Sequence, residues 1–150
     1  MRTLVTFESD AYNTSEPRPY FINPGCFGDD VARDLIGRLK ARGVSAESEP
    51  GQEDFGWYVT FDAADTSHQF VIGFRPDDDE RGTWIGWVER NVGLIGTIFG
   101  RRKKAVLSDA PLLVHEILAE HPLIRNVRWH RQDDFDRRNE EASSDTPNPP

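Results

Sequence analysis

An apolar stripe at helical spacing is the clearest pattern in the first third of the chain. Val31, Leu35 and Leu39 lie four residues apart, which places them on one side of a helix. Asp29 suits the positive end of the helix dipole, and Gly43 is placed to end the helix. The sequence therefore predicts a helix that begins near Asp29 and buries this stripe in a core.

Alternation of apolar and polar residues predicts strands along much of the remaining chain. The alternating runs lie at residues 2–8, 44–48, 55–62, 69–75, 83–90 and 124–131. A second helix is expected from about Ser108, with Pro111 in its first turn, and Pro122 stops it. Short hairpins join most of the strands, so the sheet should be largely antiparallel.

These elements predict an α+β fold, a single-domain two-layer sandwich with a mostly antiparallel sheet of five to six strands and two helices packed on one face. From Gln132 onward the chain has almost no apolar residue. We therefore expect one domain over residues 1–132 and a disordered, acidic and polar C-terminal tail over residues 133–150.

Three neighbouring predicted strands each carry one glycine beside large aromatic residues. The glycines are Gly56, Gly73 and Gly86. A glycine inside a strand often marks a close approach by another group, so the three indicate a shallow trough walled by aromatic rings. The alternation assigns a core face to Trp57, Val59, Phe61, Phe70, Ile72, Phe74, Ile85 and Trp87. On the opposite face it places Tyr58, Arg75 and Trp84, which we expect to point outward together.

The chain of 150 residues is acidic, with a formal net charge of −8 and a pI near 5.0. Such a surface repels phosphate backbones, which disfavours general nucleic-acid binding, and it attracts a basic protein partner. Cys26 is the sole cysteine, so no internal disulfide forms and a reducing compartment is expected. The first residues lack the apolar segment of a secretory signal, and no run approaches the roughly 20 apolar residues of a membrane span. We expect a cytoplasmic, bacterial protein.

Two adjacent carboxylates, Glu53 and Asp54, lie at the mouth of the aromatic run. Contact with Phe55 and Trp57 would favour the protonated form of one carboxyl, as a general acid requires. The alternative is a polar turn before a strand, because neighbours in an extended chain point apart. Cys26 is expected to be an inert thiol, since two aspartates at the same helix end oppose a thiolate.

Neither the histidines nor the acidic loops carry a strong metal-ligand pattern. His115 and His121 are six residues apart, whereas the metalloprotease motif needs histidines four apart. Asp62, Asp65 and His68 give only a weak metal signal. We therefore expect no metal and no cofactor.

An apolar, glycine-spaced segment that ends in four basic residues runs over residues 92–104. It is a candidate docking loop or a membrane-surface adaptor for anionic lipid, and the plainer interpretation is an edge segment that covers the core. Arg128 and His130 share one face of the last predicted strand, with Trp129 on the other. Because the chain is acidic, we interpret these basic residues as ion-pair partners and not as a nucleic-acid site.

The sequence favours a small protein-binding or ligand-binding module without catalysis. Its site would comprise Glu53, Asp54, Tyr58, Arg75 and Trp84, since aromatic residues and arginine often anchor interfaces. One version is an acidic inhibitor, such as an immunity protein, of a basic protein partner. The alternative is a small enzyme that uses Glu53 or Asp54 as its acid or base in an aromatic-lined pocket.

Overall fold

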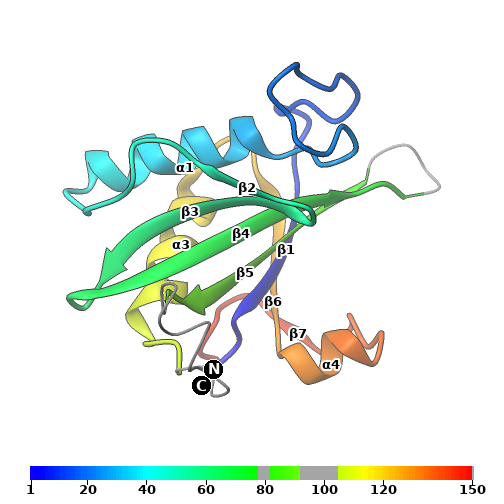
Figure 1. Cartoon of the computed structure of the whole chain (residues 1–150). Coiled ribbons are helices and arrows are strands. Elements are labelled where there is room, and N and C mark those ends of the chain that lie inside the picture. The colour runs from blue at the N-terminus through cyan, green and yellow to red at the C-terminus, as the bar shows by residue number, and fades with distance from the viewer. Residues whose placement is uncertain (78–81, 92–104, 150) are drawn as a thin grey trace, which may run out of the picture.

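The computed structural model describes residues 1–77, 82–91 and 105–149 of the chain (Figure 1). They form one open antiparallel sheet with two main helices packed against it, as the sequence predicts. The helices are α1 (Asp29–Ala41), α3 (Asp109–Glu120) and the short α4 (Gln132–Asp136). The strands are β1 (Leu4–Glu8), β2 (Gly51–Glu53), β3 (Gly56–Ala63), β4 (Thr66–Arg75), β5 (Thr83–Arg90), β6 (Arg125–His130) and β7 (Ser143–Ser144). Their spatial order is β2-β3-β4-β5-β1-β6-β7, which makes seven strands instead of five or six.

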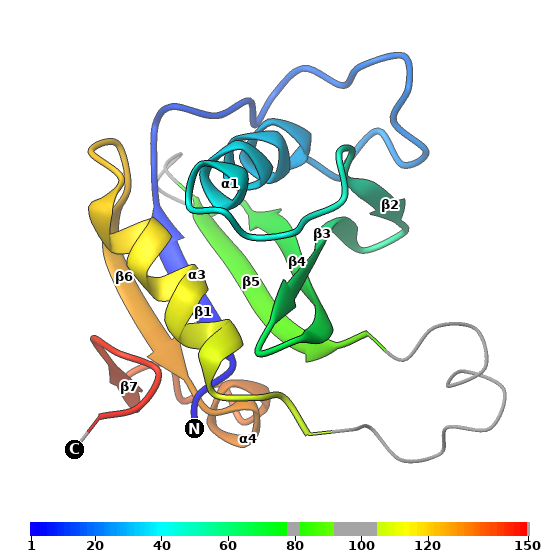
Figure 2. The ribbon, with the colours of Figure 1, turned by 90° about the vertical axis from the view of Figure 1, so that its left-hand side faces the viewer.

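Both main helices cover the same face of the sheet, which we call the inner face (Figure 1 and Figure 2). The helix α1 packs against β3, and α3 packs against β3 and β6. The helix α1 begins after Gly28, whose φ of 134° suits glycine, and ends before Gly43, whose φ is 77°. Its stripe of Val31, Leu35 and Leu39 is buried, so the predicted first helix is confirmed.

The core lies between the inner face and the two helices. The strands contribute Val5, Phe7, Trp57, Val59, Phe61, Phe70, Ile72, Trp84, Val88 and Trp129 to it. The helices contribute Val31, Ala32, Leu35, Ile36, Leu39, Val114, Ile117 and Leu118. The predicted core face of β3 and β4 is therefore confirmed, apart from the half-buried Phe74 at the margin.

Strand β5 has the opposite orientation from the one that the sequence analysis expects. Phe74 and Trp84 are partners in adjacent strands, and such partners share a face of the sheet. Trp84 is therefore 0% exposed in the core, and the prediction that it points outward is wrong. Ile85 and Trp87 point to the other face, so their assignment to the core is wrong as well.

The three strand glycines make room for neighbouring groups of the sheet and do not line a trough. A Cβ atom on Gly86 would lie 2.3 Å from Cζ of Phe70. A Cβ atom on Gly56 would lie 2.5 Å from the carbonyl oxygen of Ile72, and the backbone of the β2–β3 turn covers Gly73. The predicted trough is therefore filled by the protein itself.

Adding one methyl group at Gly86 should destabilise the fold. Gly86→Ala forces the Phe70 ring out of its position, and overpacking of this kind costs about 1–3 kcal/mol. Gly37→Ala is the matched control, since no atom lies within 4 Å of the added carbon. In a helix, alanine is favoured over glycine by roughly 0.5–1 kcal/mol. Urea unfolding, followed by tryptophan fluorescence, should give a lower free energy of unfolding for the first variant and a higher one for the second. Equal losses in both variants would contradict this packing.

Two predicted segments differ from the structure, and a third is not described. Residues 44–48 form a single bridge, between Ala46 and Phe61, instead of a strand. The segment expected to be a disordered tail contains α4 and β7, and the domain boundary at residue 132 stays a prediction. The segment 92–104 lies outside the described residues, so its roles also stay predictions.

Candidate functional site

The face of the sheet opposite the two main helices, the outer face, carries a group of aromatic side chains. Tyr58, Val71 and Trp87 are partners across β3, β4 and β5, so their side chains form one row. The Phe55 ring lies 5.8 Å from the Trp87 ring, centroid to centroid, and Phe55 is 56% exposed. We call Phe55, Tyr58 and Trp87 the outer-face cluster. Aromatic side chains of this kind are enriched among the anchors of protein interfaces.

The two predicted carboxylates border the outer-face cluster. Glu53 ends β2, Asp54 begins the turn to β3, and both are exposed. Glu53 is the partner of Gly56, which directs its side chain to the outer face. A general acid in an aromatic pocket needs a desolvated carboxyl, and neither residue has that environment.

Arg75 points to the outer face, as predicted, but lies away from the cluster. It is four residues along β4 from Val71, which is about 13 Å at the rise of a strand. Its guanidinium donates to both carboxylate oxygens of Glu140, at 2.5 and 3.2 Å, and lies 3.6 Å from Asp77. Hydrogen bonding to Glu140 raises the pKa of Arg75. The structure thus brings together three of the five predicted site residues: Glu53, Asp54 and Tyr58.

Residues 132–147, which we call the C-terminal strap, fold back against β6 on the outer face. Phe135 of α4 places its ring 5.6 Å from the ring of His130. Arg128 forms an ion pair with Asp145, as the sequence predicts for the basic residues of this strand. The anchor at Arg75 adds a third attachment. Because these contacts are polar or involve a single ring, the low apolar content of the segment does not reveal them.

His130 is held between β1 and the strap, and it is 1% exposed. Its Nε2 atom lies 2.8 Å from Thr6 Oγ1, while its Nδ1 atom has no hydrogen-bond partner in the described part of the chain. Burial lowers the pKa of His130. The charged groups that act on its ring are Glu140, Arg128, Arg2 and Arg75.

Mild acid should loosen the C-terminal strap through His130. Its pKa in the folded protein lies below the ordinary 6.5, so stability is complete above that pH and is lost as the pH falls below it. Amide hydrogen exchange of the strap, corrected for intrinsic rates, should rise several-fold between about pH 7.5 and about pH 5.5. His130→Gln should remove most of this rise, and amides of α1 serve as the internal control. A rise of the same size in both segments would show global unfolding and contradict the prediction.

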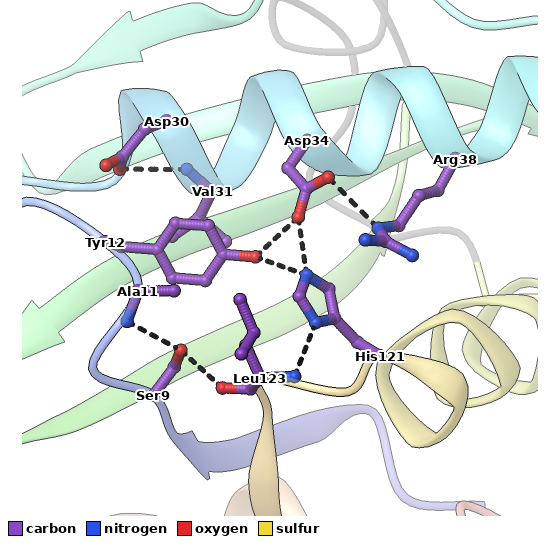
Figure 3. A network of polar contacts seen from close by, with 9 residues as sticks. All are labelled: Ser9, Ala11, Tyr12, Asp30, Val31, Asp34, Arg38, His121 and Leu123. Atoms are coloured by element: carbon purple, nitrogen blue, oxygen red, sulfur yellow. Dashed lines mark hydrogen bonds and ion pairs between the residues drawn. The ribbon is translucent and has the colours of Figure 1, made fainter.

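A second polar cluster, the Tyr–Asp–His network, joins the loop after β1 to both main helices (Figure 3). Tyr12 donates its hydroxyl hydrogen to Asp34 Oδ2 at 2.6 Å, and His121 Nε2 lies 2.7 Å from the same oxygen. Arg38 Nε donates to Asp34 Oδ1 at 3.0 Å. The Leu123 amide donates to His121 Nδ1 at 3.0 Å, so Nε2 carries the proton and donates to the carboxylate.

This network contains a tyrosine, an aspartate and a histidine, side chains that can serve in acid–base chemistry. In this protein they are hydrogen-bonded to one another. Burial alone would raise the pKa of Asp34, but hydrogen bonds from Tyr12 and His121 and the charge of Arg38 outweigh it and lower the pKa. Burial, followed by the bond to Asp34, raises the pKa of Tyr12. The Tyr12 ring also meets Trp84 edge-on at 5.9 Å. The arrangement therefore fastens three segments of the chain together.

Removing the Tyr12 hydroxyl should weaken the fold at neutral pH. Tyr12→Phe leaves a partly buried carboxylate short of one donor, which costs about 1–2 kcal/mol. Tyr20→Phe is the matched control, because Tyr20 also donates to an aspartate, Asp29, but is half exposed. The bond lowers the pKa of Asp34, so the difference between Tyr12→Phe and wild type should shrink as the pH falls below the ordinary 3.8. Urea unfolding at several pH values measures it, and equal losses in the two variants would contradict the network's role.

The remaining candidates have local structural partners. Cys26 donates its thiol hydrogen to the carbonyl oxygen of Asp54 at 3.0 Å, and burial followed by the charge of Asp54 raises its pKa. His68 lies 3.0 Å from the Thr66 carbonyl oxygen and accepts from the Leu107 amide at 3.3 Å. Among the described residues no group of three side chains is placed to hold a metal ion.

The sequence analysis misses Trp87 and Phe55 of the cluster and Tyr12 and Asp34 of the network. For Trp87 a signal exists, because Phe70 and Gly86 suit each other on adjacent strands and fix the orientation of β5. For Tyr12 and Asp34 no local signal exists, since the loop that carries Tyr12 has no periodic pattern.

Comparison with models of protein families, with curated proteins and with solved structures finds no match to this chain. Within the described residues, no helix combines the length and the apolar character that crossing a membrane requires. The assignment of a function therefore depends on the geometry of the outer face.

Proposed function

We propose that this protein is a binding module without catalysis, which takes a basic protein partner on the outer-face cluster. The observation that supports the proposal is the contact between the rings of Phe55 and Trp87, tilted by 32° to each other, on a face that neither main helix covers. An exposed phenylalanine against a half-buried tryptophan presents apolar area at low cost in side-chain entropy. Such a pair suits the buried centre of an interface.

The charges around the cluster favour a basic partner. Glu53 and Asp54 border it, and Glu89 points to the same face from β5. Two arginines of this face, Arg75 and Arg128, are paired with carboxylates of the strap. The described charged residues that border the cluster are therefore acidic, in line with the net charge of −8. Acidic rims steer basic partners and speed their association.

A more specific form of this proposal is that the protein is an acidic inhibitor, such as an immunity protein, of a basic partner. Only the charge and the size of the chain support this form. The enzyme alternative depends on Glu53 or Asp54 as acid or base, and the exposure of both removes the desolvated pocket that it needs. We therefore place the binding module first.

Truncating Phe55 should weaken partner binding while leaving the fold intact, because Phe55 is 56% exposed. Wild-type protein fixed to a resin should recover a stoichiometric partner from lysate, and the purified pair is then titrated by calorimetry. Phe55→Ala should weaken the affinity roughly tenfold or more, as loss of an interface anchor does. Added salt should weaken it further.

Ile22→Ala is the matched control, since Ile22 is another exposed apolar residue, 67% exposed, that lies outside the outer face. It should leave the affinity unchanged. Capture that resists both Phe55→Ala and Trp87→Ala, with both variants folded, would rule out the outer-face cluster as the binding site. Turnover of a substrate that depends on Glu53 would favour the enzyme instead.

A further inference from the structure

A pocket of about 400 Å³ lies between the turn of the β3–β4 hairpin and the first turns of α3. Figure 2 shows these two elements close together, below the end of α1. The pocket, which we call the hairpin groove, is lined by Val44, Asp62, Ala63, Ala64, Asp109, Leu112, Leu113 and Glu116. None of these residues belongs to the outer-face cluster or to the Tyr–Asp–His network, so the groove is a separate feature.

The floor of the hairpin groove is apolar. Five of its eight lining residues are aliphatic: Val44, Ala63, Ala64, Leu112 and Leu113. Leu112, in the first turn of α3, is 37% exposed, whereas Val114, Ile117 and Leu118 of the same helix are buried. Covering such a side chain with an apolar group from a partner stabilises the complex by removing its surface from water.

The rim of the groove is acidic, and one of its three carboxylates is paired with an arginine. Asp62, Asp109 and Glu116 contribute carboxylates, and within the described residues no lysine or arginine lines the pocket. Glu116 is held by Arg42, with 2.9 Å between Nη1 and Oε2. Asp62 and Asp109 form no ion pair within the described residues, and both are exposed. Two carboxylates beside an aliphatic floor complement a cationic group on an aliphatic stem.

A second, smaller pocket extends the groove along β3. It holds about 250 Å³, shares Asp62 with the hairpin groove, and is lined by polar groups of the loop before β2, Ser45 and Ser48 among them. Glu47 adds a further carboxylate there. An extended peptide that crosses both pockets would find hydrogen-bonding groups on one side and an apolar floor on the other.

We propose that the hairpin groove binds a segment of a partner protein in which a lysine or arginine stands beside a leucine-like residue. The aliphatic side chain lies on Leu112 and Leu113, and the cation lies between Asp62 and Asp109. This site is independent of the outer-face cluster, and either can exist without the other. An anionic or purely polar segment would leave the floor uncovered or meet unbalanced negative charge.

The test uses the full-length protein and a short peptide that alternates leucine and arginine, titrated by calorimetry and by amide chemical shifts. The shifts should map to the hairpin turn and the start of α3. Asp62→Asn should weaken binding by about threefold, the scale of one exposed ion pair. Leu112→Ser should weaken it by about tenfold, since an apolar contact is lost. A peptide with alanine in place of leucine should bind as weakly as the Leu112→Ser variant binds the original.

Asp65→Asn is the matched control, because it makes the same charge change three residues away, at an exposed position with a φ of 55° that asparagine tolerates. It should leave binding unchanged, as should Trp87→Ala on the outer face. Equal weakening by Asp62→Asn and Asp65→Asn would reduce the binding to general charge attraction and overturn the proposal. Sedimentation that reveals a dimer lost in Leu112→Ser would assign the groove to a second copy of this chain and overturn it too.

Discussion

Aromatic rings that lie over glycines of the neighbouring strand are the constraint from which the arrangement of both faces follows. Phe70 on β4 covers Gly86 on β5, and the Tyr58 ring covers Gly51 on β2. A strand glycine leaves the space of a side chain empty, and a ring from the next strand closes it. The fit holds at one register, because a shift by one residue turns every side chain of the strand to the other face. The register in turn decides that Trp84 packs in the core and that Trp87 meets Phe55 outside.

The sequence predicts the orientation of a helix or strand correctly where only one of its faces is apolar. The α1 stripe has polar residues opposite it, so one orientation buries far more apolar surface, and the same holds for β3. In β5 both faces are apolar, with Trp84 on one and Trp87 on the other. The pattern of apolar and polar residues then does not distinguish the two faces, and only the cross-strand partners determine which face of β5 is buried. The error in the orientation of β5 removes Trp84 from the predicted binding surface, whereas Glu53, Asp54 and Tyr58 stay together at the outer face.

The polar contacts were beyond prediction for a different reason, which is their separation along the chain. Tyr12 lies 22 residues from Asp34, and Asp34 lies 87 residues from His121. The Arg75–Glu140 pair spans 65 residues. No spacing between nearby residues predicts such contacts. Each of these polar residues, taken alone, is typical of a solvated surface. The strap shows the consequence, because a segment of low hydropathy is ordered by three separate polar or single-ring anchors.

The position of these anchors also explains why the outer face is divided into a covered and an open part. Arg128 and His130 lie on β6, and Arg75 lies at the end of β4, so these three attachments of the strap involve no residue of β2 or β3. The carboxylates of the strap neutralise the arginines of this face. The aromatic row, with Glu53 at its border, lies outside these three attachments. The strap carboxylates pair with Arg75 and Arg128, and this pairing neutralises two cations that would otherwise attract anionic groups to the outer face.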